Sequence, residues 1–354
     1  MEYTTLGSTG TEVSELCFGT WRFGRETGGV GERSSVGSQA SSDYVVETDR
    51  EEAHELLDAA WDRGINFIDT ANVYGTPNGK SEEFIGEWLE DHDRDDFVLA
   101  SKVYFPFDGW GEPGPNDSGL GRKHIRRQVE GTLDRLGTDY LDLYYIHRWD
   151  DETPVKETLR TLNDLVREGT VHHLGASTMA AWKLTKALWK SDVEGIERFD
   201  VTQPLFHAAY RDDVIDYLDV CADQDLAVCP YSPLAGGFLT GKYEREGDDV
   251  VAPEGSRGDI DPRFDEYYVS DRGWEVVDEV RAVADEVDAT PAQVSLRWLM
   301  DQEKFTCVPI VGARTTDQLA ENAGATDVSL SSDQHDRISE ARYDEEGRRW
   351  GHRD

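Results

Sequence analysis

Four side chains of this chain have the chemistry needed to act together on a carbonyl group. They are Asp69 and Tyr74 in the stretch NFIDTANVYG, Lys102 in VLASKVYF and His147 in LDLYYIHRWD. A phenol beside a lysine ammonium, with a carboxylate paired to that ammonium, is suited to donating a proton to a developing alkoxide near neutral pH. The residue types therefore predict proton transfer to a carbonyl oxygen, as in a carbonyl reductase.

Each of the four residues has its own physical reason for a role. Tyr74 would be the proton donor, but a free phenol has a pKa of about 10 and is a weak acid at neutral pH. We expect the Lys102 ammonium to lower that pKa, and Asp69 to keep the ammonium charged in a partly dry site. His147 would hydrogen-bond to the substrate oxygen and orient it toward Tyr74.

The same residue types also have ordinary structural uses. An aspartate after a strand often caps a helix, a loop tyrosine often packs, and a single histidine is often a satisfied polar group. Four such residues after successive strands favour the catalytic interpretation. A metal site is not expected, because His147 has no second ligand at helical spacing and the neighbours His172 and His173 point to opposite sides of a strand.

Short apolar runs alternate with longer amphipathic ones from Val13 onward, which is typical of repeated βα units. Strands are expected at residues 15–19, 66–69, 97–101, 141–146, 171–176, 199–203, 226–230 and 307–310. Helices are expected at residues that include 49–64, 81–92, 122–137, 153–169 and 290–301. Eight such strands predict one α/β domain over residues 1–354, a closed (β/α)8 TIM barrel with long loops on its C-terminal face. Such barrels carry their chemistry on that face, where the four residues would meet.

Two segments interrupt the alternation. Residues 24–48 are rich in glycine and serine and lack periodicity, so they are expected to form a long mobile loop after the first strand. Residues 241–271 follow the seventh strand and are expected either to fold over a bound ligand as a lid or to elaborate the surface without a role.

The chain is strongly acidic, with 73 Asp and Glu against 36 Lys and Arg and a net charge of −37. Its 10 Trp, 14 Tyr and 12 Phe argue against disorder. Carboxylates spread along the chain predict a halophilic, salt-requiring protein, because molar salt screens their repulsion. Nucleic acid is disfavoured as a partner, since the one dense basic run, residues 122–127, is expected to be a solvated helix face.

The cysteines and the apolar stretches indicate the compartment. No CxxC spacing occurs, and the expected reduced core residues are Cys17, Cys221, Cys229 and Cys307. No apolar stretch approaches the roughly 20 residues of a membrane span, and the N-terminus lacks a signal-peptide core. We therefore expect a cytoplasmic protein without a membrane partner, and the sequence leaves its oligomeric state open.

Three stretches of sequence carry a family likeness. They are TLGSTGTEVSELCFGTW near the start, FIDTANVYG followed by Lys102 and His147, and PIVGARTTDQLAENAGA near the end. Over nearly its whole length the chain resembles the aldo-keto reductases, NAD(P)H-dependent oxidoreductases built on a TIM barrel. The resemblance implies reduction of aldehydes or ketones to alcohols with Tyr74 as proton donor. RKHIRRQVEGTLDRLGTDYLDLYYIHRWD and GASTMAAW are closest to the aryl-alcohol dehydrogenase-like branch, which implies aromatic or medium-chain aldehydes.

A dinucleotide would be held without a Rossmann fingerprint, because GTWRFG lacks the three-glycine pattern. The resemblance implies that Ser177 and Gln203 hold the nicotinamide carboxamide and that Tyr231 stacks on its ring. The glycine-rich turn at residues 232–242 would offer backbone N–H groups to the pyrophosphate. The implied set is Gly19, Thr20, Ser177, Thr178, Gln203, Tyr231, Ser232, Leu234, Gly236, Gly237, Arg314, Gln318, Glu321 and Asn322.

Two residues of this set bear on cofactor choice and contact. Arg314 is able to bind a 2′-phosphate with both guanidinium nitrogens, so NADP(H) is the expected cofactor and NAD stays an alternative. Thr178 stands where many relatives have asparagine, so its hydroxyl would have to replace the second carboxamide contact.

The substrate pocket and the rival functions depend on the loops. Four aromatic residues would either enclose an aryl or alkyl aldehyde or simply pack, namely Trp21, Tyr104, Trp110 and Trp149. One rival function is a cofactor-binding regulatory subunit or sensor with little turnover, like the potassium-channel β subunits. Another is an isomerase or aldolase in which Lys102 forms a Schiff base, although its Asp69 partner disfavours the neutral amine.

Overall fold

Eight parallel strands form the central sheet of the computed structural model, which describes residues 1–27, 45–107, 113–210, 214–247, 249–261 and 264–341. In chain order they are β3 (Cys17–Gly19), β6 (Phe67–Asp69), β7 (Val98–Val103), β8 (Leu141–Ile146), β9 (Val171–Ser177), β10 (Val201–Gln203), β11 (Ala227–Val228) and β14 (Ile310–Val311). From β3 to β11 each strand pairs in parallel with the next one in this order, and β14 pairs in parallel with β3.

Backbone hydrogen bonds between β11 and the residues before β14 close the sheet on itself. Val228 accepts from Val308 at 2.9 Å and donates to Thr306 at 2.8 Å, and Ile310 donates to Pro230 at 3.0 Å. The predicted (β/α)8 TIM barrel is confirmed. Its eighth strand was predicted at residues 307–310 but runs from Ile310 to Val311, because residues 306–308 contact β11 only through isolated bonds.

A cluster of buried, mostly apolar side chains fills the interior of the barrel. Its members are Leu6, Val13, Cys17, Phe67, Val98, Ala100, Leu143, Tyr145, Val201, Ala227, Cys229, Val308 and Ile310. Tyr145 fits there because β9 has a glycine beside it: a Cβ on Gly175 would lie 2.2 Å from the ring. The hairpin of β1 (Tyr3–Thr5) and β2 (Glu12–Ser14) adds Leu6 and Val13 to this cluster, so it covers the N-terminal end of the barrel.

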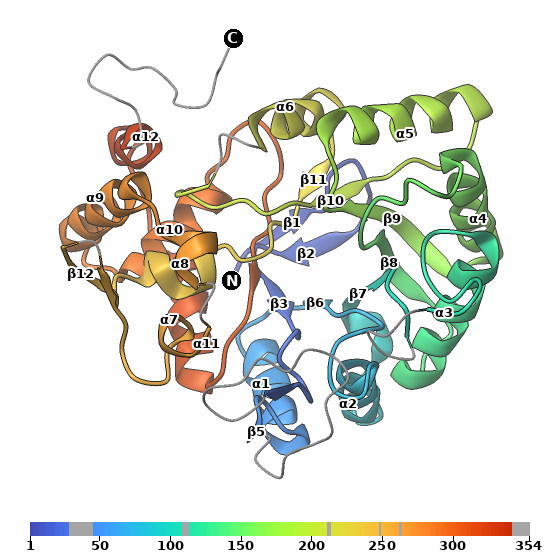
Figure 1. Cartoon of the computed structure of the whole chain (residues 1–354), viewed down its shortest axis with the longest axis horizontal. Coiled ribbons are helices and arrows are strands. Elements are labelled where there is room, and N and C mark those ends of the chain that lie inside the picture. Colours follow the sequence, from blue (N-terminus) through green and yellow to red (C-terminus); the bar gives the residue numbers. More distant parts are fainter. Residues whose placement is uncertain (28–44, 108–112, 211–213, 248, 262–263, 342–354) are drawn as a thin grey trace.

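Helices surround the barrel (Figure 1). They are α1 (Arg50–Trp61), α2 (Lys80–Leu89), α3 (Arg122–Leu136), α4 (Val155–Glu168), α5 (Ala181–Glu194), α6 (Ile215–Asp223), α9 (Asp271–Val287), α10 (Pro291–Met300), α11 (Thr316–Ala323) and α12 (Ser332–Glu340). Their ends follow from capping chemistry. Asp49 and Thr290 begin α1 and α10 with capping boxes, and left-handed glycines end α3, α4 and α5.

Both predicted inserts contain regular structure. In the described ends of residues 24–48, β4 (Glu26–Thr27) pairs with β5 (Val45–Val46), so the two ends of the predicted loop are joined by a short antiparallel pair. Residues 241–271 form the hairpin of β12 (Glu244–Glu246) and β13 (Asp249–Val251), followed by α7 (Arg257–Ile260) and α8 (Phe264–Tyr268). The division into a single domain stays a prediction.

Three further expectations concern the surface and the cysteines. The basic run of α3 is paired with carboxylates, through Arg122–Asp164, Arg126–Glu168 and Arg127–Asp117. All four cysteines are free and buried, as predicted. Within the described residues, every helix is too short or too polar to cross a lipid bilayer.

Candidate active site

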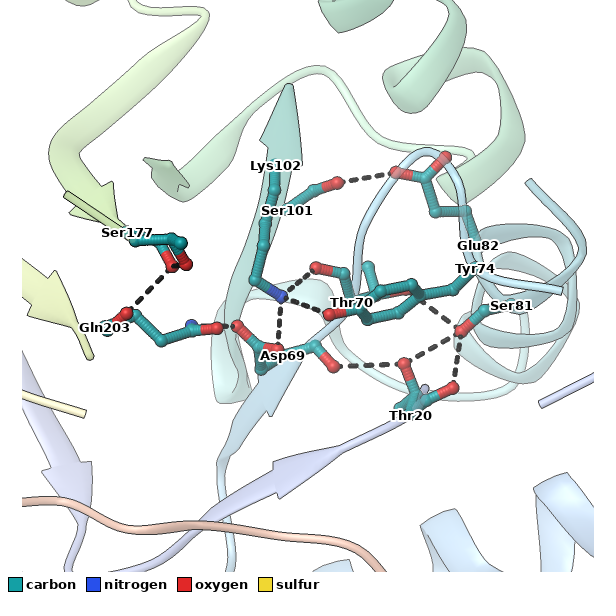
Figure 2. A network of polar contacts seen from close by, with 11 residues as sticks. Thr20, Asp69, Thr70, Tyr74, Ser81, Glu82, Ser101, Lys102, Ser177 and Gln203 are labelled. Carbon is teal, nitrogen blue, oxygen red and sulfur yellow. Dashed lines mark hydrogen bonds and ion pairs between the residues drawn. The ribbon is translucent and has the colours of Figure 1, made fainter. Parts of the chain in front are cut away.

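Lys102 lies between Asp69 and Tyr74 (Figure 2). Its Nζ is 2.5 Å from Asp69 Oδ1, 2.7 Å from the carbonyl oxygen of Thr70 and 3.1 Å from Tyr74 Oη. Asp69 ends β6 and Lys102 lies near the end of the adjacent β7, so parallel pairing brings the two side chains to the same rim. The structure therefore joins three of the four predicted catalytic residues in one chain of hydrogen bonds.

Lys102 is fully buried and Asp69 is 3% exposed. Burial alone would lower the pKa of Lys102, but Asp69 and Tyr74 outweigh it and raise the pKa above its ordinary value. Burial also raises the pKa of Asp69. Lys102 and a hydrogen bond from Gln203 Nε2, which is 2.8 Å from Asp69 Oδ2, lower this pKa but do not cancel the effect of burial. Lys102 is therefore an ammonium ion in a dry site, and one of its hydrogen bonds goes to the Tyr74 oxygen.

Burial raises the pKa of Tyr74 above its ordinary value of 10.0, because the opposing effect of Lys102 is smaller. Lys102 acts in the predicted direction and lowers the pKa of Tyr74, but burial has the larger effect, so the pKa lies above its ordinary value. The phenol is consequently protonated at neutral pH, which is the form that a proton donor needs. Lys102 contributes when the proton leaves, since its charge stabilises the phenolate.

His147 follows β8 and completes the predicted group. Its ring centroid is 6.0 Å from that of Tyr74 and 5.1 Å from that of Phe105, edge to face in both cases. Its Nδ1 is buried without a hydrogen-bond partner in the described part of the chain. Burial, with a smaller contribution from Lys102, holds the pKa of His147 well below its ordinary value of 6.5. The imidazole is therefore neutral and available to hydrogen-bond to a ligand.

A hydroxyl network fixes the loop that carries Asp69 and Tyr74 (Figure 2). Thr20 Oγ1 donates to the Asp69 carbonyl at 3.0 Å. Ser81 Oγ, at the start of α2, is 2.8 Å from Thr20 Oγ1 and 3.0 Å from Thr70 Oγ1. Thr20 was predicted to contact the cofactor. In the structure its hydroxyl instead holds the end of β6, which carries Asp69.

Gln203 links Asp69 to the predicted nicotinamide site. Its side chain bonds to Asp69, and its carbonyl accepts from Ser177 Oγ at 2.8 Å. Ser177 Oγ is also 3.1 Å from Thr178 Oγ1, and Thr178 has a left-handed backbone with φ of +51°. An amide has a second N–H and an oxygen to offer a ligand, so Gln203 is able to serve both sites.

The turn after β11 contains the tyrosine and the glycines that were predicted to contact the cofactor. Tyr231 is half-buried, and a hydrogen bond with Thr178 opposes the rise in its pKa that burial causes. After Tyr231 the backbone has positive φ at four positions, namely Ser232, Ala235, Gly236 and Gly237. Turns of this kind aim successive backbone N–H groups at one point, which suits an anion. Gly237 has a φ of +99°, which residues with a side chain rarely adopt, and a Cβ there would lie 3.1 Å from Lys242 Nζ.

Five cations gather beside this turn and are here called the basic cluster: Arg22, Arg25, Lys242, Arg257 and Arg314. Burial lowers the pKa of Lys242, and the charges of Arg314 and Arg22 add to that effect. Burial also lowers the pKa of Arg22. Glu47 opposes this effect, and the charges of Arg314 and Arg257 add to it. Glu47 pairs with Arg22 and Arg25, and Asp261 lies 3.8 Å from Arg257. Excess positive charge on so acidic a chain suits a polyanionic ligand.

The predicted adenosine residues lie at α11, next to the basic cluster. Arg314 Nη1 donates to the Gly255 carbonyl at 2.9 Å, which ties α11 to the segment before α7. Gln318 Oε1 accepts from the Arg314 backbone at 2.9 Å, and Asn322 is buried. Glu321 is exposed on the same helix, and its charge raises the pKa of Lys242 against the effect of burial.

Two further predicted cofactor residues have backbone or packing positions. Gly19 ends β3, where a Cβ would lie 2.6 Å from a methyl group of Ile310. Leu234 packs against the small apolar cluster around Leu16 and Val311.

The aromatic residues predicted for the substrate pocket are distributed unevenly. Tyr104 packs against Phe105, with ring centroids 5.1 Å apart. The Trp149 indole donates to Asp151 at 3.0 Å, and Lys183 lies 5.6 Å from its ring. Trp110 lies outside the described residues.

Trp21 packs against arginines of the basic cluster. The guanidinium carbons of Arg25 and Arg257 lie 3.9 and 5.5 Å from its ring. Arg257 belongs to the 241–271 segment, so this stacking connects that segment to the end of the first barrel strand.

Sequence reasoning missed Phe105 and most of the basic cluster. Phe105 follows β7 and contacts His147, and its place just after the Lys102 strand was an available signal. The position of Lys242 at the end of the glycine-rich turn was a second available signal. Arg257 had no local signal for this cluster, because its neighbours there, Trp21 and Arg22, are distant in the sequence.

Comparisons with known proteins agree on one family. The sequence profile of the aldo/keto reductase family matches residues 15–342. An uncharacterised oxidoreductase, YrpG, from Bacillus subtilis is 33% identical over 94% of this chain and 93% of its own length. A probable voltage-gated potassium channel subunit beta from Arabidopsis thaliana is 33% identical over 93% of this chain and 92% of its own. Norsolorinic acid reductase B from Aspergillus parasiticus is 34% identical over 93% and 81%.

Proposed function

The chain belongs to the aldo/keto reductase family, and from that premise we propose that it reduces aldehydes or ketones to alcohols with NADPH. The observation that carries the proposal is the buried Lys102 ammonium, 2.5 Å from Asp69 and 3.1 Å from the Tyr74 hydroxyl. Aromatic or medium-chain aldehydes are the proposed substrates, supported by the Phe105 ring, which packs on both His147 and Tyr104.

The proposed mechanism assigns one task to each side chain. Reduced nicotinamide, when bound, supplies the hydride for the carbonyl carbon. His147, neutral because of its lowered pKa, donates a hydrogen bond to the carbonyl oxygen and directs it toward Tyr74. Tyr74 donates its proton to that oxygen as negative charge develops there. Lys102 stabilises the resulting phenolate, and Asp69 keeps Lys102 protonated.

The residues present fit a dinucleotide phosphate. Ser177, Thr178 and Gln203 would hold the carboxamide end, and Tyr231 would stack on the ring. The positive-φ turn at Gly236 and Gly237 offers N–H groups to the pyrophosphate. The basic cluster would take the 2′-phosphate, with Arg314 as the guanidinium partner.

Cofactor preference gives a first prediction. Replacing Arg314→Gln should raise KM for NADPH about tenfold and leave KM for NADH nearly unchanged, because only NADPH carries the phosphate that the guanidinium would pair with. Steady-state kinetics with both cofactors measure this. Arg122→Gln is the matched control, since Arg122 pairs with Asp164 outside the cluster. Equal losses for both cofactors would show that Arg314 does not select the phosphate.

The pH dependence gives a second prediction. Raised Tyr74 and lowered His147 pKa values keep the phenol protonated and the imidazole neutral between their ordinary values of 10.0 and 6.5. Turnover at saturating aldehyde and NADPH should therefore be flat across that interval. A fall in kcat centred near neutral pH would mean that one of these groups titrates there and that its assigned form is wrong.

Salt dependence gives a third. A net charge of −37 repels itself, so the free energy of unfolding should rise with KCl concentration up to molar levels. Denaturant titrations at several KCl concentrations measure it, and potassium glutamate distinguishes cation screening from a chloride effect. A protein equally stable in dilute buffer would contradict the halophilic assignment.

The experiment that tests the function is direct. Purified protein in molar KCl is mixed with NADPH and a panel of aldehydes, and the absorbance of the reduced cofactor is followed. Oxidation of NADPH with an equal amount of alcohol formed is the expected result. Absence of oxidation with every aldehyde, despite tight NADPH binding, would favour the second candidate.

That second candidate is a cofactor-binding regulatory subunit, and the Arabidopsis relative, named a probable channel subunit, is the observation that favours it. A Schiff-base function for Lys102 is disfavoured, because the raised pKa keeps its amine protonated.

A further inference from the structure

Helix α5 presents an apolar stripe to solvent on an otherwise acidic protein. Trp182, Trp189 and Val193 are 60%, 59% and 59% exposed. They are spaced seven and four residues apart, so they lie on one side of the helix, with Lys186 between them. A single exposed tryptophan is ordinary, but two on one helix face indicate a contact surface.

The same helix concentrates positive charge. The whole chain has nine lysines, and three of them are Lys183, Lys186 and Lys190 of α5. Lys186 lies 5.9 Å from the Trp182 ring and Lys190 lies 5.7 Å from the Trp189 ring. Aromatic rings flanked by cations on a chain of net charge −37 form a surface that differs in chemistry from its surroundings.

We propose that this stripe is the contact surface between two copies of the chain, paired through antiparallel α5 helices. The four stripe residues Trp182, Lys186, Trp189 and Val193 are placed symmetrically about the middle of the helix. In an antiparallel pair Trp182 meets the second copy's Val193, and Lys186 meets the second copy's Trp189. The first contact is apolar, and the second places an ammonium on an indole.

Charge complementarity selects this arrangement. In the antiparallel pair each Lys186 ammonium lies against the second copy's Trp189 ring, and the two copies of Lys186 are kept apart. Lys183 and Asp192 take no part, because Lys183 pairs with Asp151 and Asp192 lies 3.5 Å from Arg198 within the chain. A parallel pair would instead place Lys186 beside Lys186. Antiparallel helices also oppose their macrodipoles favourably, and a symmetric pair uses the same surface twice.

The interface must extend beyond α5. A stable interface buries about 800 Å² per partner, whereas a helix of this length spans only about 21 Å. The neighbours α4 and α6 flank α5, and α4 is tied to it by ion pairs from Lys156 and Arg160 to Glu194. Their outer faces would supply the remaining area.

Sedimentation velocity over a range of protein concentrations in molar KCl tests the proposal. The wild-type chain should sediment as a dimer or a multiple of it. The double variant Trp182→Gln/Trp189→Gln should have half that mass, with circular dichroism unchanged. Tyr267→Gln is the matched control, because Tyr267 is a 56% exposed aromatic on α8 and should leave the mass unchanged. A monomeric wild type, or a double variant that keeps its mass, would overturn the proposal.

Cross-linking tests the antiparallel register independently of affinity. The native cysteines are all buried, so engineered ones report without background. Under a mild oxidant, Trp182→Cys/Val193→Cys should form disulfide-linked dimers. Neither single variant should do so, because in this register each position faces the other and not itself. Dimers from the single variants, or none from the double variant, would overturn the register.

Discussion

Tyr74→Phe should lower kcat by about a hundredfold or more and leave the NADPH dissociation constant nearly unchanged. The substitution removes the oxygen that lies 3.1 Å from Lys102 but keeps the ring that packs edge to face on His147. Proton donation is lost while the packing of the ring on His147 is kept. Stopped-flow measurement of a single turnover, beside a fluorescence titration with NADPH, separates the chemical step from cofactor binding.

Tyr140→Phe is the matched control for that result. It removes a phenol oxygen that donates to Asp95 at 2.7 Å, at the opposite end of β8 from His147, and it leaves the Lys102 hydrogen bonds untouched. Its kcat should stay close to wild type. If Tyr74→Phe turned over as fast as this control, Tyr74 would not be the proton donor.

The barrel was predictable because its signals are local. Each strand is a short apolar run, and each helix between them has a buried stripe, such as Leu159, Leu162 and Leu165 on α4. Parallel pairing then places the residue after each strand on one rim, which is why Asp69, Lys102 and His147 could be grouped without coordinates. The eighth strand departs most from its predicted bounds and begins at Ile310 instead of Cys307, because its partner β11 has just two paired residues.

Other properties depend on distant neighbours and could not be predicted. The pKa of Tyr74 is set by the balance between burial and Lys102, and residue types do not give the extent of burial. The basic cluster joins Arg22 to Lys242 and Arg314, which come from three separate parts of the chain. The role of the Thr20 hydroxyl was missed for the same reason, since its partner Ser81 belongs to a later helix.

The Lys102–Asp69 pair gives the other large effect. Asp69→Asn should lower kcat about a hundredfold and cost about 3–5 kcal/mol of unfolding free energy, because a buried ammonium loses its counter-charge. The carboxylate is the main influence that raises the pKa of Lys102 against burial, so the variant's pKa should fall. Above that lowered pKa, Lys102 is neutral and no longer stabilises the phenolate. The alkaline limit of kcat should therefore move to lower pH, which a pH series on the variant measures.

The double variant Asp69→Asn/Lys102→Met separates stability from catalysis. With both charges gone, no uncompensated ion remains in the barrel, so most of the unfolding free energy lost in the single variant should return. Activity should not return, because Tyr74 then has no cation beside its oxygen. Denaturant titration and kinetics on the same preparations measure both quantities. Recovery of activity together with stability would mean that the pair serves only to hold the fold, and that proton donation from Tyr74 does not require a neighbouring charge.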